Sequence, residues 1–361
     1  MTNNRIEYID ALRGFVMVLV VLAHVPMYCY HDVEGLSFSL IPTTFHLALF
    51  FFISGWFAGD GLWFKVYGLR FTVYGLRFKV YGLRFTVYGL GGVRKKFMQL
   101  IVPTAVFYLL YCWLNGLDIV DNLWNDKYKA GYWFCIVLFC FYLTITLTKT
   151  ITRKTGSLGG VVIGAALSVV FMMFNTNAMT NWLGSHHIPN ILCLQQWQYF
   201  VFFWMGSMAN RYKERFFALL DNGRVMAVGI LLFFGSLLAF YHQPAGLVGI
   251  KTEFLLWGGL GAVLSFAFFR KYEKSFSRGT YVGRGLQYIG RRTLDVYLLH
   301  FFFLPTGMEW VGDLVMGNGN PAIELFVSLL IALMVIALCL LTSNIVRLSP
   351  VLAHWLLGVR R

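Results

Sequence analysis

The chain has 361 residues, of which 58% are hydrophobic and 13% are charged, about half the charged fraction of an ordinary soluble domain. This composition excludes a soluble globular protein and predicts an all-α, polytopic membrane bundle whose first partner is the lipid bilayer. The net charge of +14 would suggest a nucleic-acid partner in a soluble protein. In a membrane protein it is first a signal of topology, so no nucleic-acid partner is expected.

Apolar runs long enough to cross a bilayer recur along the chain and predict about ten transmembrane helices. They fall at about 11–29, 41–58, 97–117, 131–148, 159–174, 196–210, 225–241, 252–269, 293–306 and 321–345. Of the 30 Lys and Arg residues, only Lys127, Lys129 and Lys251 fall in segments that this order places outside. The positive-inside rule therefore predicts that the N- and C-termini are both cytoplasmic. No small-residue cleavage site follows the first run, so no cleaved signal peptide is expected.

The six cysteines are scattered, mostly within apolar runs, and no pair has the spacing of metal ligands. Neither a disulfide framework nor a metal site is expected. No bound cofactor is expected either.

The first apolar run carries charge where an ordinary membrane span would not. Arg13 and His24 are eleven residues apart, which returns to nearly the same helix face after a rise of ~16 Å. Asp10 lies one turn before Arg13, so the two can pair. Burying such groups is costly, which favours a functional site over a positive-inside anchor with a packed histidine.

These residues also carry a resemblance. Arg5, Asp10, Leu12-Arg13-Gly14 and His24 resemble the opening signature of the integral-membrane acyltransferase family 3, which includes sugar O-acetyltransferases and glucan succinyltransferases. The resemblance covers nearly the whole chain outside residues 59–93. It implies a single membrane acyltransferase domain over residues 1–361 and a location in a bacterial cytoplasmic membrane.

The second run, Phe45 to Trp56, is similar to an aromatic run of that family that ends in Ser-Gly-aromatic. Ser54 and Gly55 would let another helix approach closely, which is a packing role. His46 matches a histidine of some family branches, although Ala48 replaces the proline that often follows it. His46 and Ser54 are therefore candidates for either the acceptor side or packing.

Lys96 and Gln99 stand where the family has two arginines ahead of a proline, here Pro103. Lys96 keeps the positive charge of one of these two positions, and Gln99 does not keep that of the other. Lys96 is therefore either an acyl-donor ligand or a positive-inside anchor. His186 and His187 lie in an outer loop, where they either contact an acceptor or are solvated, and we expect the second.

Late in the chain, Thr293, Tyr297 and His300 fall at i, i+4 and i+7, one face of a helix. They match the family's hydroxyl residue, tyrosine and histidine, with threonine in place of the commoner serine. Arg292 and Asp295 can pair at i, i+3. Counted from Arg292, His300 lies ~12 Å into the membrane, a second histidine reached from a cytoplasmic arginine.

Residues 64–90 are a tandem heptad repeat in which Tyr67, Tyr74, Tyr81 and Tyr88 are each followed by glycine. Glycine in every heptad disfavours a coiled coil, and Val, Tyr, Phe and Thr favour strands. Alternatively, the cationic, aromatic segment could lie on anionic headgroups. We expect a non-catalytic insertion, at about 59–93, in a cytoplasmic loop.

The leading hypothesis is an O-acyltransferase that moves an acetyl or succinyl group from cytosolic acyl-CoA, its co-substrate, to a hydroxyl of an extracytoplasmic carbohydrate. Arg13, with Lys96 and Arg292, would bind the donor phosphates. His24 would be the general base, with His300 as the next candidate and Asp10 orienting Arg13. No Gly-x-Ser-x-Gly motif supports an acyl-serine, while an acyl-histidine stays open.

Two other classes of protein fit part of the pattern. A transporter could use membrane Asp, Arg and His as a proton or substrate path, but no paired half-chain repeat is visible. A purely structural scaffold would not explain why His24 and His300 each lie within the membrane on a helix that also carries an arginine. The acyl group, the acceptor and the oligomeric state are not specified by the sequence.

Overall fold

The computed structural model describes residues 6–30, 40–62, 77–152, 156–175, 190–240 and 247–359. These residues contain helices joined by turns and loops, without a β-strand, which confirms the all-α prediction. By contacts within the chain they divide into two compact units, Met1–Ser54 with Tyr212–Ser349, and Gly55–Arg211 with Pro350–Arg361. That residues 1–361 act as one functional domain stays a prediction.

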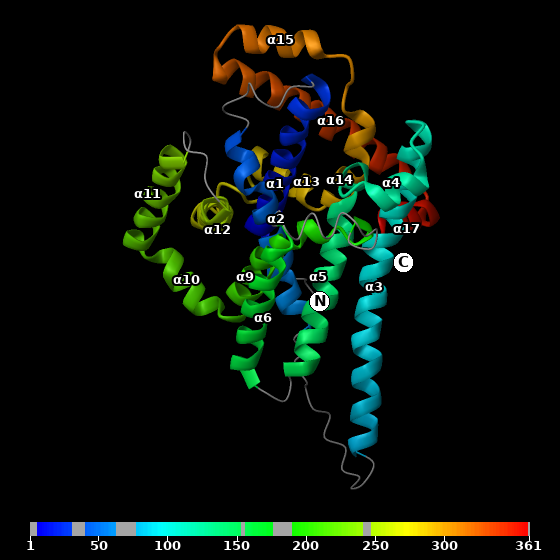
Figure 1. Ribbon diagram of the computed structural model, residues 1–361, viewed down its shortest axis with the longest axis vertical. Coiled ribbons are helices and arrows are strands. Elements are labelled where there is room, and N and C mark those ends of the chain that lie inside the picture. Colours follow the sequence, from blue (N-terminus) through cyan, green and yellow to red (C-terminus); the bar gives the residue numbers. More distant parts are fainter. Residues whose placement is uncertain are drawn as a thin grey trace. The chain divides into compact units, whose positions relative to one another are not determined.

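The first unit is built around α1, with Gly14 and Gly290 at its closest helix contact. Its helices are α1 (Glu7–Val25), η1 (Pro26–Tyr30), the first part of α2 (Leu40–Leu62), α10 (Lys213–Asp221), α11 (Gly223–Phe240), α12 (Leu247–Lys271), α13 (Tyr281–Gly290), α14 (Thr293–Phe303), α15 (Glu309–Gly317) and α16 (Pro321–Val346). α1 contacts α12, α13, α14 and α16 (Figure 1). A Cβ atom at Gly14 would lie 1.9 Å from the Leu286 carbonyl oxygen, and one at Gly290 would lie 1.8 Å from the Asp10 carbonyl oxygen. Small residues here let the backbones of α1 and α13 meet.

The second unit is held together mainly by aromatic side chains. It contains α3 (Arg77–Leu114), α4 (Ile119–Asn125), η2 (Lys129–Gly131), α5 (Trp133–Thr152), α6 (Gly156–Met173), η3 (Leu194–Tyr199), α9 (Phe200–Arg211) and α17 (Pro350–Leu357). The Phe141 ring contacts those of Phe200 and Phe203 with centroids 5.3 and 5.6 Å apart. A Cβ atom at Gly55 would lie 1.8 Å from the Phe203 carbonyl oxygen, so the predicted close helix approach at this glycine is confirmed.

Lys129, expected in an outer segment, is buried at a turn of the second unit. Its Nζ donates a hydrogen bond to the Asp126 carbonyl oxygen. Burial in this loop lowers the pKa of the Lys129 ammonium group. The sequence predicted on which side of the membrane Lys129 lies, but it did not predict that the Lys129 side chain is buried.

Several helices are long and apolar enough to cross a bilayer. Within the described residues four pass by length and composition, namely Glu7–Tyr30, Gly92–Leu114, Lys251–Lys271 and Pro321–Val346. A fifth is Lys213–Asp221 with Gly223–Leu238 if this pair, bent by 78°, forms one span. Integral membrane character is thereby supported, while about ten spans and cytoplasmic termini stay predictions.

The predicted span 293–306 is shorter in the structure. α14 has 11 residues and ends at Phe303, where Leu304 turns to an extended conformation. Pro305 follows, and a residue before proline is driven away from helical ψ. Helix α14 is therefore a short apolar helix packed among longer ones.

The strand-like expectation for the heptad repeat is wrong over residues 77–90, which form the first part of α3. Adding residues to an existing helix is easier than nucleating one, so residues 92–114 can extend the helix back into the repeat. Residues 64–76 of the repeat lie outside the described residues, as do His186 and His187.

Candidate functional site

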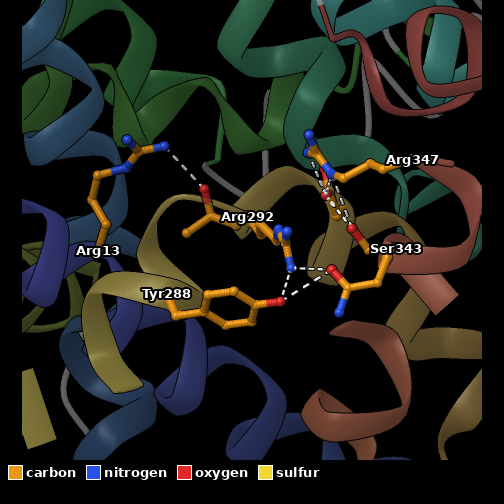
Figure 2. Close-up of polar contacts among 8 residues, drawn as sticks. Arg13, Tyr288, Arg292, Ser343 and Arg347 are labelled. Atoms are coloured by element: carbon orange, nitrogen blue, oxygen red, sulfur yellow. Dashed lines mark hydrogen bonds and ion pairs between the residues drawn. The ribbon is translucent and has the colours of Figure 1, made fainter. Parts of the chain in front are cut away.

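The candidate site begins at the first half of α1. Arg13 Nη1 lies 3.8 Å from Asp10 Oδ1, which confirms the predicted pair. Its Nη2 donates a 3.1 Å hydrogen bond to Thr293 Oγ1 at the start of α14 (Figure 2). The two motifs that the sequence placed some 280 residues apart are therefore joined by a direct bond.

The two membrane histidines lie next to each other. The ring centroids of His24 and His300 are 5.1 Å apart, and Phe301 contacts both rings. His24 is half-buried, whereas His300 is fully buried. Thr293, Tyr297 and His300 all lie within the helix α14, which places them on one face as predicted, and all three are buried.

Main-chain carbonyl groups determine which ring nitrogen is free in each histidine. His24 Nδ1 lies 2.7 Å from the Val20 oxygen, and His300 Nδ1 lies 2.7 Å from the Tyr297 oxygen. A carbonyl oxygen only accepts, so each Nδ1 carries the hydrogen. A neutral imidazole then has its lone pair at Nε2, and within the described residues His300 Nε2 has no hydrogen-bond partner.

The predicted pair between Arg292 and Asp295 is wrong. Asp295 Oδ2 instead accepts a 2.6 Å bond from Arg347 Nη2 and another of 2.6 Å from the Ser343 hydroxyl. Arg292 precedes α14 as its N-cap residue, while Asp295 lies in the first helical turn. Asp295 is buried toward α16, so the partner comes from α16 rather than from the neighbouring turn.

Arg292 is held by neutral groups. Its Nη1 donates to the Tyr288 hydroxyl and to Asn344 Oδ1, and its guanidinium lies 4.3 Å from the Tyr288 ring centroid (Figure 2). Among the described residues it has no carboxylate partner, in contrast to Arg347 with Asp295. Arg292 therefore brings an unneutralised positive charge to the start of α14.

Sequence reasoning missed Ser343, Asn344 and Arg347. Their signal was present, because Ser343 and Arg347 are polar residues at i, i+4 near the end of the long apolar helix α16. They clamp the N-terminal end of α14 through Asp295 and Arg292.

The remaining predicted residues are spread more widely. His46 and Tyr297 are buried, Ser54 is half-buried, and the Tyr297 ring lies 6.0 Å from that of His300. Lys96 belongs to the second unit, where its Nζ lies 4.2 Å from the Tyr142 ring centroid. No described group of three or more His, Cys, Asp or Glu residues is placed to hold a metal ion.

The long apolar helices indicate an integral membrane protein, and the polar groups buried among them form the candidate site. The model of the family described as "Acyltransferase domain" matches residues 6–343, so the chain belongs to acyltransferase family 3. The family resemblance found at the N-terminus is confirmed over nearly the whole chain. No curated protein and no solved structure matches the chain. The protein is therefore a membrane acyltransferase in general terms.

Proposed function

We propose that the protein transfers an acetyl or succinyl group from cytosolic acyl-CoA to a hydroxyl of an extracytoplasmic carbohydrate, in a bacterial cytoplasmic membrane. The observation that carries this proposal is the His24–His300 pair, with ring centroids 5.1 Å apart. His24 lies on the α1 face that begins at Arg13, and His300 lies on α14. Family membership supplies the acyl transfer, and the side chains support the assignment of roles.

The donor end is the region of Arg13 and Arg292. Acyl-CoA carries several phosphate charges, and a guanidinium suits a phosphate because it offers two parallel N–H donors. Arg292 has neutral partners, and Arg13 is held by Thr293 and by Asp10 at 3.8 Å. Lys96 stays a candidate donor ligand from the sequence alone.

His24 is the proposed general base. Its Nδ1–H is held by the Val20 carbonyl, which leaves the Nε2 lone pair to take the proton of the acceptor hydroxyl. The hydroxyl oxygen then bonds to the thioester carbonyl carbon, the carbon–sulfur bond breaks, and the proton passes to the CoA thiolate. The pantetheine arm separates the CoA thioester from its phosphates, which agrees with a base ~16 Å along α1 from Arg13.

The test uses acyl-labelled acyl-CoA in membranes of the producing cells, which contain the natural acceptor. Both CoA thiol release and transferred label are measured. His24→Ala should lower transfer by about 10²–10⁴-fold with donor binding near normal, because only a proton acceptor is removed.

His354→Ala is the matched control. The His354 Nδ1 also contacts a main-chain oxygen, that of Val359, so this variant deletes a similar imidazole from α17. It should retain wild-type transfer. Wild-type turnover in His24→Ala would remove the base assignment, and solute movement with an intact thioester would identify a transporter instead.

Orientation is tested separately. The Lys and Arg distribution places Asp126 outside, so a variant whose single cysteine is Asp126→Cys should react with an impermeant thiol reagent added to intact cells. Labelling only after lysis would reverse the proposed donor side.

A further inference from the structure

A large cavity lies in the first unit, apart from the histidines. Its volume is about 1140 Å³, slightly above the roughly 300–1,000 Å³ of typical ligand pockets, and its walls are mainly apolar. α11, α12 and α13 provide most of the lining, with Phe15 from α1 and Phe45 from α2. A space of this size and character suits an apolar chain.

The depth of the cavity corresponds to one leaflet of a bilayer. Its lining on α12 runs from Gly261 to Lys271, a rise of ~15 Å, and on α11 from Gly223 to Phe234, a rise of ~16.5 Å. Half of the ~30 Å hydrocarbon layer is ~15 Å. A chain in the cavity would therefore begin at a membrane surface and end near the bilayer centre.

Helix geometry separates this cavity from the candidate acyl-transfer site. Phe15 lies nine residues before His24, which is ~180° around the helix after two complete turns. The Phe15 ring contacts Phe269 of α12 at 5.3 Å, whereas His24 contacts His300 of α14. An occupant of the cavity therefore lies against the face of α1 opposite to His24.

The surface end of the cavity carries charges of both signs. Two acidic and two basic residues line it, namely Asp221, Glu273, Arg270 and Lys271. Arg270 Nη2 lies 3.0 Å from Asp221 Oδ2, and the Asp221 side chain is still 60% exposed. A purely anionic headgroup would face both carboxylates, while a zwitterion can pair with both signs.

We propose that this cavity binds one zwitterionic phospholipid with a primary-ammonium headgroup, of the phosphatidylethanolamine class. Its acyl chains fill the apolar space between α11 and α12. Its phosphate contacts Lys271 and Arg270, and its ammonium group contacts Asp221 and Glu273. The Lys and Arg distribution assigns this lipid to the cytoplasmic leaflet.

The test quantifies lipid that stays with the protein purified in mild detergent, with phosphatidylethanolamine and phosphatidylglycerol as probes. Wild type should retain about one phosphatidylethanolamine per chain, enriched over its share in the source membrane. Retained lipid that merely mirrors the membrane composition, or detergent alone, would overturn the proposal.

Two matched variant pairs locate the lipid. Ala227→Trp fills the α11 wall of the cavity and should abolish retention, whereas Val228→Trp, at the next, exposed position, should not. Glu273→Gln should reduce the preference for phosphatidylethanolamine about two- to fivefold, as expected for an exposed charge pair, while Glu214→Gln should not.

Retention in Ala227→Trp, provided that the variant purifies as a folded monodisperse protein, would overturn the cavity assignment. An unchanged preference in Glu273→Gln would overturn the headgroup assignment. The readout is lipid content, so it is independent of acyl transfer. His24→Ala protein should hold the same lipid even though it is inactive.

Discussion

The two opposite faces of α1 differ in the kind of groups that they contact. On one face Arg13 donates a hydrogen bond to Thr293 of α14, and the His24 ring contacts that of His300. On the other face Tyr8 and Phe15 meet aromatic rings of α12, and a large apolar cavity remains beside them. A polar group buried in a membrane needs a hydrogen-bond partner within the protein, because lipid chains offer none, whereas an apolar ring can lie directly against lipid.

At the polar face, one buried histidine nitrogen is left without a hydrogen bond in the described part of the chain. Both imidazoles use Nδ1 on the main chain, and the buried Nε2 of His300 has no hydrogen-bond partner among the described residues. Leaving a buried acceptor unpaired costs about 1–3 kcal/mol. Such a cost is expected at a site where a lone pair serves chemistry.

The largest effect should come from a change that breaks both faces at once. Gly14→Ala places a Cβ atom 1.9 Å from the Leu286 carbonyl oxygen, a backbone atom that cannot move alone. Overpacking a core typically costs about 1–3 kcal/mol. We expect more than ~3 kcal/mol here and loss of the α1–α13 contact, because the clashing atom belongs to the backbone and not to a flexible side chain. Thermal unfolding in detergent, lipid retention and acyl transfer should all fail together.

Gly285→Ala, on α13, is its control. No atom lies within 4 Å of a Cβ at that position, so the helix should be unchanged or slightly more stable. Wild-type stability in Gly14→Ala would show that the close contact is not needed.

The next largest effect is expected at the cluster of Asp295, Ser343 and Arg347, which joins α14 to the end of α16. Asp295→Asn removes the buried carboxylate that accepts Arg347 and Ser343, and it should cost about 3 kcal/mol, the lower end for a broken buried pair because Arg347 is partly exposed. A lower midpoint of thermal unfolding measures this loss. Asp313→Asn, an exposed carboxylate on α15, should leave the midpoint unchanged.

If the two aspartate variants unfold at the same temperature, this cluster does not support the polar face. Arg347→Met tests the same pair from its other side. It should destabilise as well, since it leaves the Asp295 carboxylate buried with only the Ser343 hydroxyl.

A smaller, specific effect is expected at the donor end. Arg13→Ala should raise the Kd for acyl-CoA about ten- to a hundredfold, because hydrogen bonds to charged groups contribute roughly 1.5–3 kcal/mol. Arg13→Lys should restore part of the affinity, since lysine keeps the charge but not the two-pronged geometry. Binding is measured by equilibrium titration in detergent.

Arg278→Ala is the control for charge alone, because Arg278 is exposed and pairs with Glu7 at 3.3 Å. Equal losses in Arg13→Ala and Arg278→Ala would indicate general electrostatic attraction. In that case Arg13 would lose its assigned role.

The smallest effect should come from the heptad repeat. An in-register deletion from Lys65 to Leu90 should leave insertion, folding and acyl transfer close to wild type, because we expect the repeat to be an insertion without catalytic residues. The comparison is made by membrane yield and CoA release. A deletion protein that inserts but no longer binds acyl-CoA would show that the repeat belongs to the donor site.

The sequence alone determined what depends on local geometry. The composition predicted a membrane protein of helices, and the N-terminal signature predicted the family that the chain belongs to. The spacing of Asp10 and Arg13 predicted their pair, because helix periodicity is a property of a few successive residues.

Tertiary structure decided which distant groups meet. Asp295 pairs with Arg347, at the end of α16, and not with Arg292, which is nearer in the sequence. His24 and His300 lie with their ring centroids 5.1 Å apart. The same is true of the cavity, whose walls come from segments far apart in the chain. Partner choice between helices follows from how their surfaces pack, and that is not encoded in the period of any single helix.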